Sequence, residues 1–234
     1  MSDQAKLVDL IERDGISSTM ACDVMGKTGW LPGITPLNSG FHISGEIKYV
    51  FAHAGTNYHL HEQVAGIEED KIIFVDAINC DQRAVFGELV ANYLLQHRRA
   101  RAIVTNGFVR DADVLIKENY PIWCIGATPI GCHKVDEPIS DGIAQLVDER
   151  KKIYENSLFI CDDSGVSQIT EDWLHDDFKR RIDFIEAQEE VWHYCVNILK
   201  WSTYETVCLQ RYLEIPSVIP EAMLDRLKVF SQKG

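Results

Sequence analysis

Between residues 46 and 125, apolar runs typical of buried strands alternate with stretches of helical spacing, and this alternation limits the possible folds more than any other feature. The predicted strands cover residues 46–51, 72–75, 102–105 and 122–125, and the predicted helices cover residues 57–67, 88–97 and 111–118. Because strands that alternate with helices are joined by crossover connections, their sheet is at least partly parallel and is covered by helices. The sequence therefore predicts an α/β fold.

The segments on either side of this region have other patterns. Two helices are predicted near the N-terminus, around residues 7–11 and 21–25, with capping residues at 17–19 ahead of the second, and a loop follows over 33–37. Beyond Pro129 the alternation stops, and short β-like runs at 143–147, 158–161 and 166–169 indicate antiparallel strands. Residues 162–165 have the composition of a hairpin turn. These runs predict a mixed sheet.

From about residue 171 the spacing of the apolar residues becomes helical. Those that recur three, four or seven residues apart are Phe178, Ile182, Ile185, Trp192 and Leu199. A long amphipathic helix that carries Trp173, Trp192 and Trp201 is predicted, and a further helix runs from Pro220 to residue 230. We therefore divide the chain into an α/β domain, 1–170, and a helical C-terminal extension, 171–234. The extension packs either on its own domain or on a neighbouring subunit, and the sequence favours neither.

Composition and charge exclude several classes of protein. No stretch of about 20 apolar residues is present, and no basic and then apolar leader opens the chain, so we expect a cytoplasmic protein without a membrane partner. Seven scattered cysteines are typical of reduced, buried thiols. A net charge of −13 opposes direct binding of nucleic acid, and it also opposes anionic substrates. An enzyme for acids would need a local cation or a metal.

The first candidate site lies at Arg110 and Asp111, where a predicted strand passes into a predicted helix. Ligands of α/β proteins bind outside the carboxyl ends of such strands. Asp111 could cap the helix or bind a metal, and Arg110 supplies a permanent cation with paired donors for a carboxylate or an enolate oxygen. By itself such a pair is more often a helix cap beside a solvated arginine.

The second candidate site is Phe86-Gly87-Glu88-Leu89, also at a junction of strand and helix. Gly87 would let the backbone approach a ligand, and the N–H groups that follow would face a substrate carboxylate. Glu88 could hold water in the outer shell of a metal, or it could be an ordinary acidic residue of a first helical turn.

The motifs together resemble the RraA-like family, which includes regulators of ribonuclease E activity and metal-dependent 4-hydroxy-4-methyl-2-oxoglutarate aldolases. The resemblance covers about residues 10–170. Its motifs, in chain order, are Asp23, Gly33-Ile34-x-Pro36-Leu37, Gly45, Asn57, Gly87-Glu88-Leu89, Asn106-Gly107-x-Val109-Arg110-Asp111, Pro129-x-Gly131 and Asp162-Asp163-Ser164-Gly165-Val166. It implies a layered sandwich with a mixed, partly parallel sheet.

The resemblance also implies an activity and roles for residues. It implies a lyase that releases pyruvate from 4-hydroxy-2-oxo acids or decarboxylates oxaloacetate-type acids. Asp111 would bind Mg²⁺ or another divalent cation such as Mn²⁺, Arg110 would stabilise the enolate, and the backbone at Gly87, Glu88 and Leu89 would receive the substrate carboxylate. No organic cofactor is expected. The family implies a homotrimer or homohexamer in which a neighbouring subunit supplies an acidic residue, for which Glu189 or Glu190 is the candidate.

Some features depart from the family pattern or allow another reading. The stretch from Glu88 to Arg110 is one residue longer than in family aldolases, and Asn106 stands in place of the common aspartate. The alternative function is a non-catalytic regulator that binds a protein partner such as a ribonuclease. His53, His59 and His61 have poor spacing for a metal site, because residues two apart on a helix point to different faces.

Overall fold

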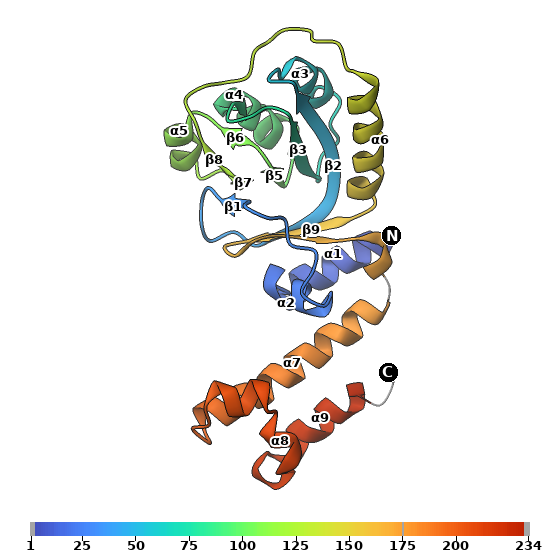
Figure 1. Cartoon of the computed structure of the whole chain (residues 1–234), viewed down its shortest axis with the longest axis vertical. Coiled ribbons are helices and arrows are strands. Elements are labelled where there is room, and N and C mark those ends of the chain that lie inside the picture. The colour runs from blue at the N-terminus through green and yellow to red at the C-terminus, as the bar shows by residue number, and fades with distance from the viewer. Residues whose placement is uncertain (1–2, 175, 232–234) are drawn as a thin grey trace. The chain divides into compact units, whose positions relative to one another are not determined.

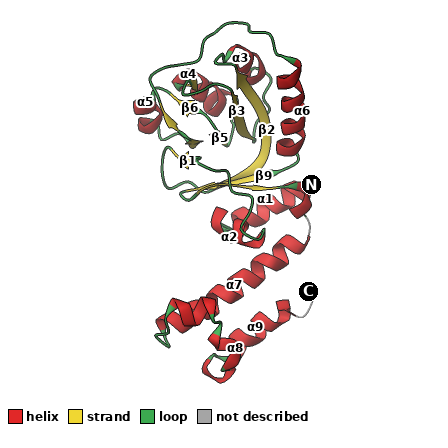
Figure 2. Cartoon of the chain, viewed as in Figure 1, coloured by secondary structure: helices red, strands yellow, loops and turns green. Residues whose placement is uncertain are grey.

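The computed structural model describes residues 3–174 and 176–231 and is shown in Figure 1. The chain divides into two compact units, Met1–Leu174 and His175–Gly234. Figure 2 shows that strands and helices are mixed in the first unit, whereas the described part of the second is helical. The α/β class predicted from the sequence is confirmed. None of the described helices is both long enough and apolar enough to cross a membrane.

A seven-stranded mixed sheet forms the centre of the first unit, in the order β1-β7-β5-β3-β2-β9-β10. Its strands are β1 Thr35–Pro36, β2 Ile43–His53, β3 Ile72–Ile78, β5 Ala102–Thr105, β7 Ile122–Cys124, β9 Leu158–Asp162 and β10 Gly165–Ile169. The four central strands β7, β5, β3 and β2 are parallel, and β1, β9 and β10 pair antiparallel at the edges. A bridge between Trp30 and Ser167 joins the two edges, so the sheet almost closes on itself.

Helices cover both faces of the central strands. The helices of this unit are α1 Asp3–Asp14, α2 Ser18–Val24, α3 Tyr58–Val64, α4 Glu88–Asn92, α5 Ala112–Lys117 and α6 Asp141–Glu155, and a π-helical stretch, Tyr93–His97, continues α4. In β3, Ile73 and Val75 pack in the same apolar cluster as residues of α3 and α4, whereas Phe74 packs in a second cluster against α6. This double cover explains the unbroken apolar run of a parallel strand.

A second, three-stranded parallel sheet positions the candidate site. It consists of β4 Ala84–Phe86, β6 Phe108–Val109 and β8 Gly126–Ala127, in the order β4-β6-β8. Phe86 is paired with Val109, and the N–H of Arg110 donates to the carbonyl of Phe86 at 3.0 Å. The residues that follow these two strands, Gly87 and Arg110, are therefore neighbours although they are far apart in the sequence.

Two predicted elements of this unit need correction. Residues 143–147, predicted as a strand, lie in α6, whose N-cap Ser140 accepts a hydrogen bond from the N–H of Ile143 at 3.4 Å. Ile143, Leu146 and Val147 pack on the sheet at spacings of three and four residues, as in a helix. Over only five residues this helical spacing cannot be distinguished from that of a short strand. The predicted loop at 33–37 contains the short strand β1. The predicted strands at 158–161 and 166–169 are confirmed as the hairpin β9–β10.

The second unit is built on α7 Asp176–Asn197, α8 Arg211–Glu214 and α9 Glu221–Ser231. Its core consists of Ala187, Val191, Cys195, Tyr212, Ile219, Leu224 and Leu227. The long helix is confirmed, but of the three tryptophans predicted on it only Trp192 lies there. Trp173 ends a 3₁₀ turn, and Trp201 follows Lys200, whose left-handed φ of 60° lies just beyond the helix. Residues 1–2, 175 and 232–234 of the predicted domains lie outside the described residues.

Candidate active site

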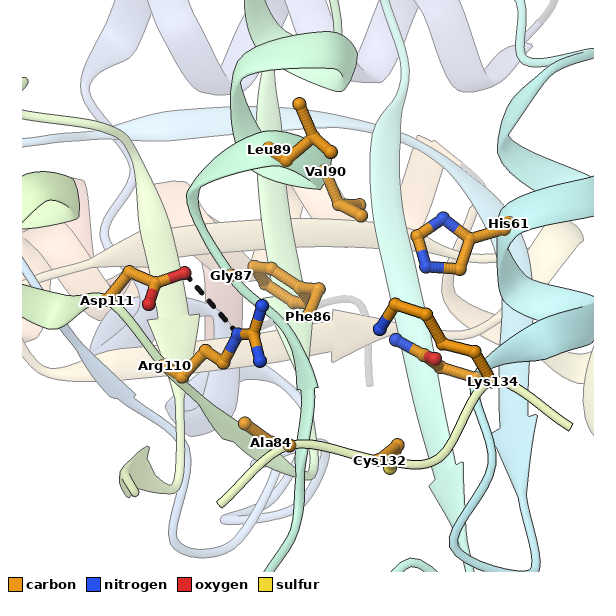
Figure 3. A pocket seen from close by; sticks show the side chains of 12 residues that line it. His61, Ala84, Phe86, Gly87, Leu89, Val90, Arg110, Asp111, Cys132 and Lys134 are labelled. Carbon is orange, nitrogen blue, oxygen red and sulfur yellow. Dashed lines mark ion pairs between the residues drawn. The ribbon is translucent and has the colours of Figure 1, made fainter. Parts of the chain in front are cut away.

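A small cavity lies at the ends of β4 and β6, and Figure 3 shows its lining. The lining residues are Asn57, His61, Ala84, Phe86, Gly87, Leu89, Val90, Arg110, Asp111, Gly131, Cys132 and Lys134. Its volume is about 50 Å³. Since one water needs about 10–15 Å³ by this measure, the cavity accommodates a few waters or part of a small organic acid.

Gly87 makes room at the centre of this cavity. Its backbone is extended, with φ −143° and ψ −157°, a conformation open to any residue. Space is the constraint, because a Cβ on Gly87 would overlap the Oδ2 atom of Asp111 and lie 2.8 Å from Cγ of Arg110. The predicted convergence of Gly87, Arg110 and Asp111 is therefore present in the structure.

Asp111 has an unusual backbone and an unusual partner. It precedes α5 with a left-handed φ of 59°, and its side chain makes no capping hydrogen bond to that helix. Its Oδ2 atom instead accepts a hydrogen bond from the N–H of Glu88 at 3.2 Å and lies 3.5 Å from Nε of Arg110. Asp111 therefore occupies the N-cap position of α5, but its side chain does not cap that helix. Sparsely populated backbone conformations of this kind gather at ligand sites.

The remaining predicted residues of the α/β unit differ in position. The guanidinium of Arg110 faces Gly131, where a Cβ would lie 3.0 Å from a terminal nitrogen of Arg110. Leu89 lines the cavity with a largely exposed side chain. Glu88 contributes its backbone N–H, but its side chain is not among those that line the cavity. Asp23 lies on α2, where it is paired with Lys27.

Three polar residues on the other side of the cavity were not predicted as part of it: Asn57, His61 and Lys134. In Figure 3, His61 and Lys134 lie opposite Arg110 and Asp111. Burial, and then the charge of Lys134, lower the pKa of His61. The cavity thus contains two cationic side chains, Arg110 and Lys134, in a chain of strongly negative net charge. Local cations of this kind are what an anionic ligand would require.

One of two neighbouring buried thiols, Cys132, belongs to the cavity lining. Its side chain shares a hydrogen bond with that of Cys80. This hydrogen bond raises the pKa of Cys80, with burial acting in the same direction. The same bond lowers the pKa of Cys132, with help from the charges of Arg83 and Lys134. Both residues are free cysteines, as the scattered spacing predicted.

Asn106, which the motif placed before Arg110, supports the strands and does not line the cavity. Its Oδ1 accepts a hydrogen bond from the N–H of Ala77 at 2.7 Å, and its Nδ2 donates to Asp76 at 2.7 Å. The fully buried Asp76 also accepts hydrogen bonds from Tyr49 and Arg150. This network, which spacing did not reveal, fixes the ends of β3 and β5 beneath the site.

The two acidic residues considered for a neighbouring subunit, Glu189 and Glu190, lie on α7 of the second unit. Glu190 forms an ion pair with Arg226 of α9 at 2.9 Å. Their approach to another subunit's site stays a prediction.

The donor set around Asp111 fits one kind of metal site. Among the described residues, no group of three or more His, Cys, Asp or Glu side chains could hold an ion. Mg²⁺ is commonly held by one or two carboxylates and keeps several waters. The Asp111 carboxylate is 41% exposed inside a cavity with room for waters, and it therefore fits such an ion.

Comparisons with known proteins agree with this fold. The model of the RraA-like family, described as Aldolase/RraA, matches residues 17–167. The solved structure of Streptomyces coelicolor RraAS2, described as an unusual member of the RNase ES inhibitor RraA protein family, superposes with a TM-score of 0.58 and 20% identity. That match covers 79% of this chain and 93% of the other, and at this identity it shows the fold alone.

Two curated proteins are similar in sequence. Protein DlpA of Legionella pneumophila is 25% identical over 199 residues, which cover 79% of this chain and 31% of that protein. A Shewanella oneidensis protein named "Putative 4-hydroxy-4-methyl-2-oxoglutarate aldolase" is 30% identical over 81 residues, which cover 35% of this chain and 49% of that protein. The chain thus spans less than half the length of either curated relative.

Proposed function

Because this chain belongs to the RraA-like family, we propose that the cavity at Gly87, Arg110 and Asp111 is the active site of a divalent-metal-dependent lyase for small 2-oxo acids. The reaction is retro-aldol cleavage of a 4-hydroxy-2-oxo acid, which releases pyruvate, or decarboxylation of an oxaloacetate-type acid. The observation that carries the proposal is the convergence of a cation, a carboxylate and a glycine from two separate motifs on one small cavity.

Both reactions need positive charge at one oxygen. When the carbon–carbon bond breaks, its electron pair moves onto the 2-oxo group and leaves an enolate. In the retro-aldol direction the 4-hydroxyl loses its proton and becomes a carbonyl, and in decarboxylation the other fragment leaves as CO₂. A proton added at C3 of the enolate then gives pyruvate. Arg110 would donate hydrogen bonds to the enolate oxygen, and its side chain lies beside Gly87 and Gly131 in the cavity lining, which supports this role. A divalent ion bound by Asp111 would supply further positive charge to the same oxygen.

The hydrogen bond between Asp111 and Glu88 indicates how the carboxylate end of the substrate is received. The N–H of Glu88 now donates to the Asp111 carboxylate, which stands where a substrate carboxylate would accept the same hydrogen bond. If Asp111 bound a cation instead, this N–H would be available to the substrate. Gly87 leaves the necessary space, and Leu89 places apolar surface beside the carbon chain.

The test measures pyruvate from oxaloacetate and from a 4-hydroxy-2-oxo acid, with Mg²⁺, with Mn²⁺ and with a chelator. We expect release that requires the metal and that disappears in Arg110→Ala. The metal with Arg110→Ala serves as the control for decarboxylation that the ion performs without the protein. If unmodified protein and Arg110→Ala release pyruvate at the same rate from every substrate, the proposal is wrong.

A non-catalytic regulator is the second candidate function, and the name of the Streptomyces coelicolor protein favours it. A protein-binding regulator has no need of Asp111 in a cavity, so capture of a partner that survives Asp111→Ala would favour this reading. The reading is weaker because it leaves Gly87, Arg110 and the strained Asp111 without a role.

We propose further that the protein is a homotrimer or homohexamer whose interface passes close to the cavity. Exposed apolar side chains lie in or beside its lining, among them Leu89, Ile130 and Val135, which are each about half exposed or more. Apolar surface of this kind marks interfaces between proteins. Light scattering that gave the mass of a monomer would contradict this proposal.

A further inference from the structure

Two cysteines from distant parts of the sequence meet beside the cavity. Cys80 lies just after β3 and Cys132 directly follows Gly131, and their side chains share a hydrogen bond within one apolar cluster. Cys132 is among the side chains that line the cavity in Figure 3, whereas Cys80 lies behind it and is 1% exposed. The proposed lyase reaction uses neither thiol. Two thiols in contact are the starting arrangement for oxidation to a disulfide.

Backbone hydrogen bonds hold the two cysteine segments together. The N–H of Ala84 donates to the carbonyl of Ile130 at 2.8 Å, and the N–H of Cys132 donates to the carbonyl of Ala84 at 3.0 Å. Cys80 is fixed just before the same strand, because its carbonyl accepts a hydrogen bond from the N–H of Arg83 at 3.0 Å. The fold itself therefore places the two sulfurs next to one another.

The surroundings make the two thiols unequal. The hydrogen bond with Cys80 lowers the pKa of Cys132 against the effect of burial, and the charges of Arg83 and Lys134 help to lower it. The same hydrogen bond, together with burial, raises the pKa of Cys80. Burial raises the pKa of Cys124 to about 11. Because the thiolate is the nucleophilic form, Cys132 is the thiol that reacts first, and Cys80 is the one that keeps its proton.

The cavity determines which oxidant reaches Cys132. Its volume of about 50 Å³ accommodates hydrogen peroxide, which is about as large as two waters, but not an oxidant as large as a peptide disulfide. Cys80 is not among the residues that line the cavity. A small peroxide therefore meets Cys132 and not Cys80.

We propose that Cys80 and Cys132 form a redox-active pair, which hydrogen peroxide converts to a disulfide that inactivates the site at Arg110. Sγ of Cys132 attacks one peroxide oxygen, the O–O bond breaks, and a sulfenic acid and water form, with the thiol proton passing to the leaving hydroxide. Sγ of Cys80 then attacks Sγ of Cys132, the S–O bond breaks, and a second water leaves with the proton of Cys80. The two thiols lose two electrons and the peroxide gains them. A dithiol such as dithiothreitol reverses the change by exchange.

The disulfide would disturb the backbone beside Arg110. Its sulfurs lie about 2.05 Å apart, closer than two hydrogen-bonded thiols, so Cys80 or Cys132 has to move. Gly131, next to Cys132, lies so close to Arg110 that a Cβ there would be 3.0 Å from a terminal nitrogen of the guanidinium. We expect oxidation to lower pyruvate release by about tenfold to 100-fold, as small displacements of catalytic groups do. This consequence rests on the proposed function, whereas formation of the disulfide does not.

Mass spectrometry of the full chain tests the pair without any assay of activity. The chain is treated with a small excess of hydrogen peroxide, the remaining thiols are alkylated after unfolding, and the peptides are mapped. We expect Cys80 and Cys132 to be joined and protected from alkylation, and dithiothreitol to make both available again. Cys124 should react more than about tenfold more slowly than Cys132, because its raised pKa keeps it protonated.

Three variants identify the role of each thiol. Cys80→Ala removes the second thiol, so Cys132 should stop at the sulfenic acid, which dimedone traps. Cys132→Ala should leave Cys80 unoxidised and make pyruvate release insensitive to peroxide. The matched control is Cys208→Ala, which removes an exposed thiol of the second unit and should form the disulfide as the unmodified chain does. Each variant is compared with its own untreated form, so that effects of the substitution itself cancel.

The outcomes separate this inference from the proposed function. If Cys80 and Cys132 are still alkylated at a peroxide concentration that oxidises the exposed Cys208, the inference is wrong. If the disulfide forms and the oxidised and reduced chains release pyruvate equally, the pair does not control the site at Arg110 and the inference is also wrong. If the disulfide forms and the reduced chain releases no pyruvate from any substrate, the proposed function is overturned and the redox-active pair stands.

Discussion

The carboxylate of Asp111 accepts a hydrogen bond from the backbone N–H of Glu88 at 3.2 Å, although Glu88 begins α4 and Asp111 immediately precedes α5. This bond joins the two motifs that resemble the family. In this structure the N–H of Glu88 is therefore already bonded to a carboxylate of the protein, and a substrate carboxylate at the same place would need that N–H. Binding of a cation to Asp111 and binding of a substrate at Glu88 should therefore favour one another.

The first prediction concerns this coupling. Asp111→Asn should abolish measurable binding of Mn²⁺, because the carboxylate is the charged donor that a hard cation needs. Asparagine tolerates the left-handed backbone at this position, so the variant should stay folded. Calorimetry or the electron paramagnetic resonance of Mn²⁺ measures the binding, with Asp113→Asn on the same helix as the control. Equal Mn²⁺ affinity in the two variants would exclude Asp111 as the ligand.

The second prediction concerns the space around Gly87. Gly87→Ala should lower kcat/KM by about 100-fold, because the new methyl group displaces Arg110 and Asp111, and small displacements of catalytic groups have effects of this size. The extended backbone of Gly87 accepts alanine, so circular dichroism should show an intact fold. Gly142→Ala is the control, because nothing lies within 4 Å of a Cβ there. Full activity in Gly87→Ala would show that the substrate does not enter between these residues.

The third prediction concerns Arg110. Arg110→Ala should lower kcat by about 100-fold to 1000-fold, as loss of one fixed oxyanion donor does. Arg110→Lys should recover only part of the rate, since lysine keeps the charge without the planar pair of donors. The control Arg99→Ala removes an exposed arginine of a surface ion pair and should leave turnover unchanged. A normal kcat with a raised KM in Arg110→Ala would limit Arg110 to binding.

Much of the sheet could be predicted because its strands are buried on both faces and therefore apolar without interruption. Ala102–Thr105 has the predicted bounds for this reason. Gly87, Arg110 and Asp111 could be identified because each stands where a strand passes into a helix. The strand β6 has only two residues, which is too short for an alternation of apolar and polar residues to be recognised in the sequence. Its pairing with β4 nevertheless brings the two motifs together.

Asn57, His61 and Lys134 could not be assigned to the cavity from spacing. They reach it through backbone contacts between distant segments, such as the bridge from Ala84 to Gly131, and no local pattern records such contacts. A signal did exist, because Lys134 follows the Pro129-x-Gly131 motif closely. The buried pair of Asp76 and Arg150 was missed for the same reason, since its partners come from β3 and α6.

That pair gives the fourth prediction. Arg150→Met should lower the free energy of unfolding by about 1–2 kcal/mol, less than for a fully buried ion pair, because Arg150 is 37% exposed while Asp76 stays fully buried without its cation. Tyr49 and Asn106 continue to donate to Asp76, which limits the loss. Urea denaturation measures it, with Lys151→Met on the same helix as the control. Equal stability of the two variants would show that Tyr49 and Asn106 satisfy the Asp76 carboxylate without the arginine.

The fifth prediction concerns the stability of the fold at acidic pH. His53 is fully buried, and neither ring nitrogen has a hydrogen-bond partner among the described residues. Burial, and then the neighbouring His59, lower the pKa of His53, with a weaker opposing effect of Glu137. Below the usual histidine pKa of about 6.5, the unfolded chain therefore binds a proton that the folded His53 does not. The free energy of unfolding should fall as the pH falls through this range.

His59 acts in the opposite direction, so the variant must isolate His53. Burial lowers the pKa of His59, but hydrogen bonds with Glu62 and the carbonyl of Glu137 raise it overall, and its contribution is lost as the pH rises. His53→Phe should flatten the decline in stability between about pH 6.5 and pH 5, whatever its stability at neutral pH. Urea denaturation at each pH measures the slope, with the exposed His97→Gln as control. An unchanged slope in His53→Phe would mean that other groups set the acid sensitivity.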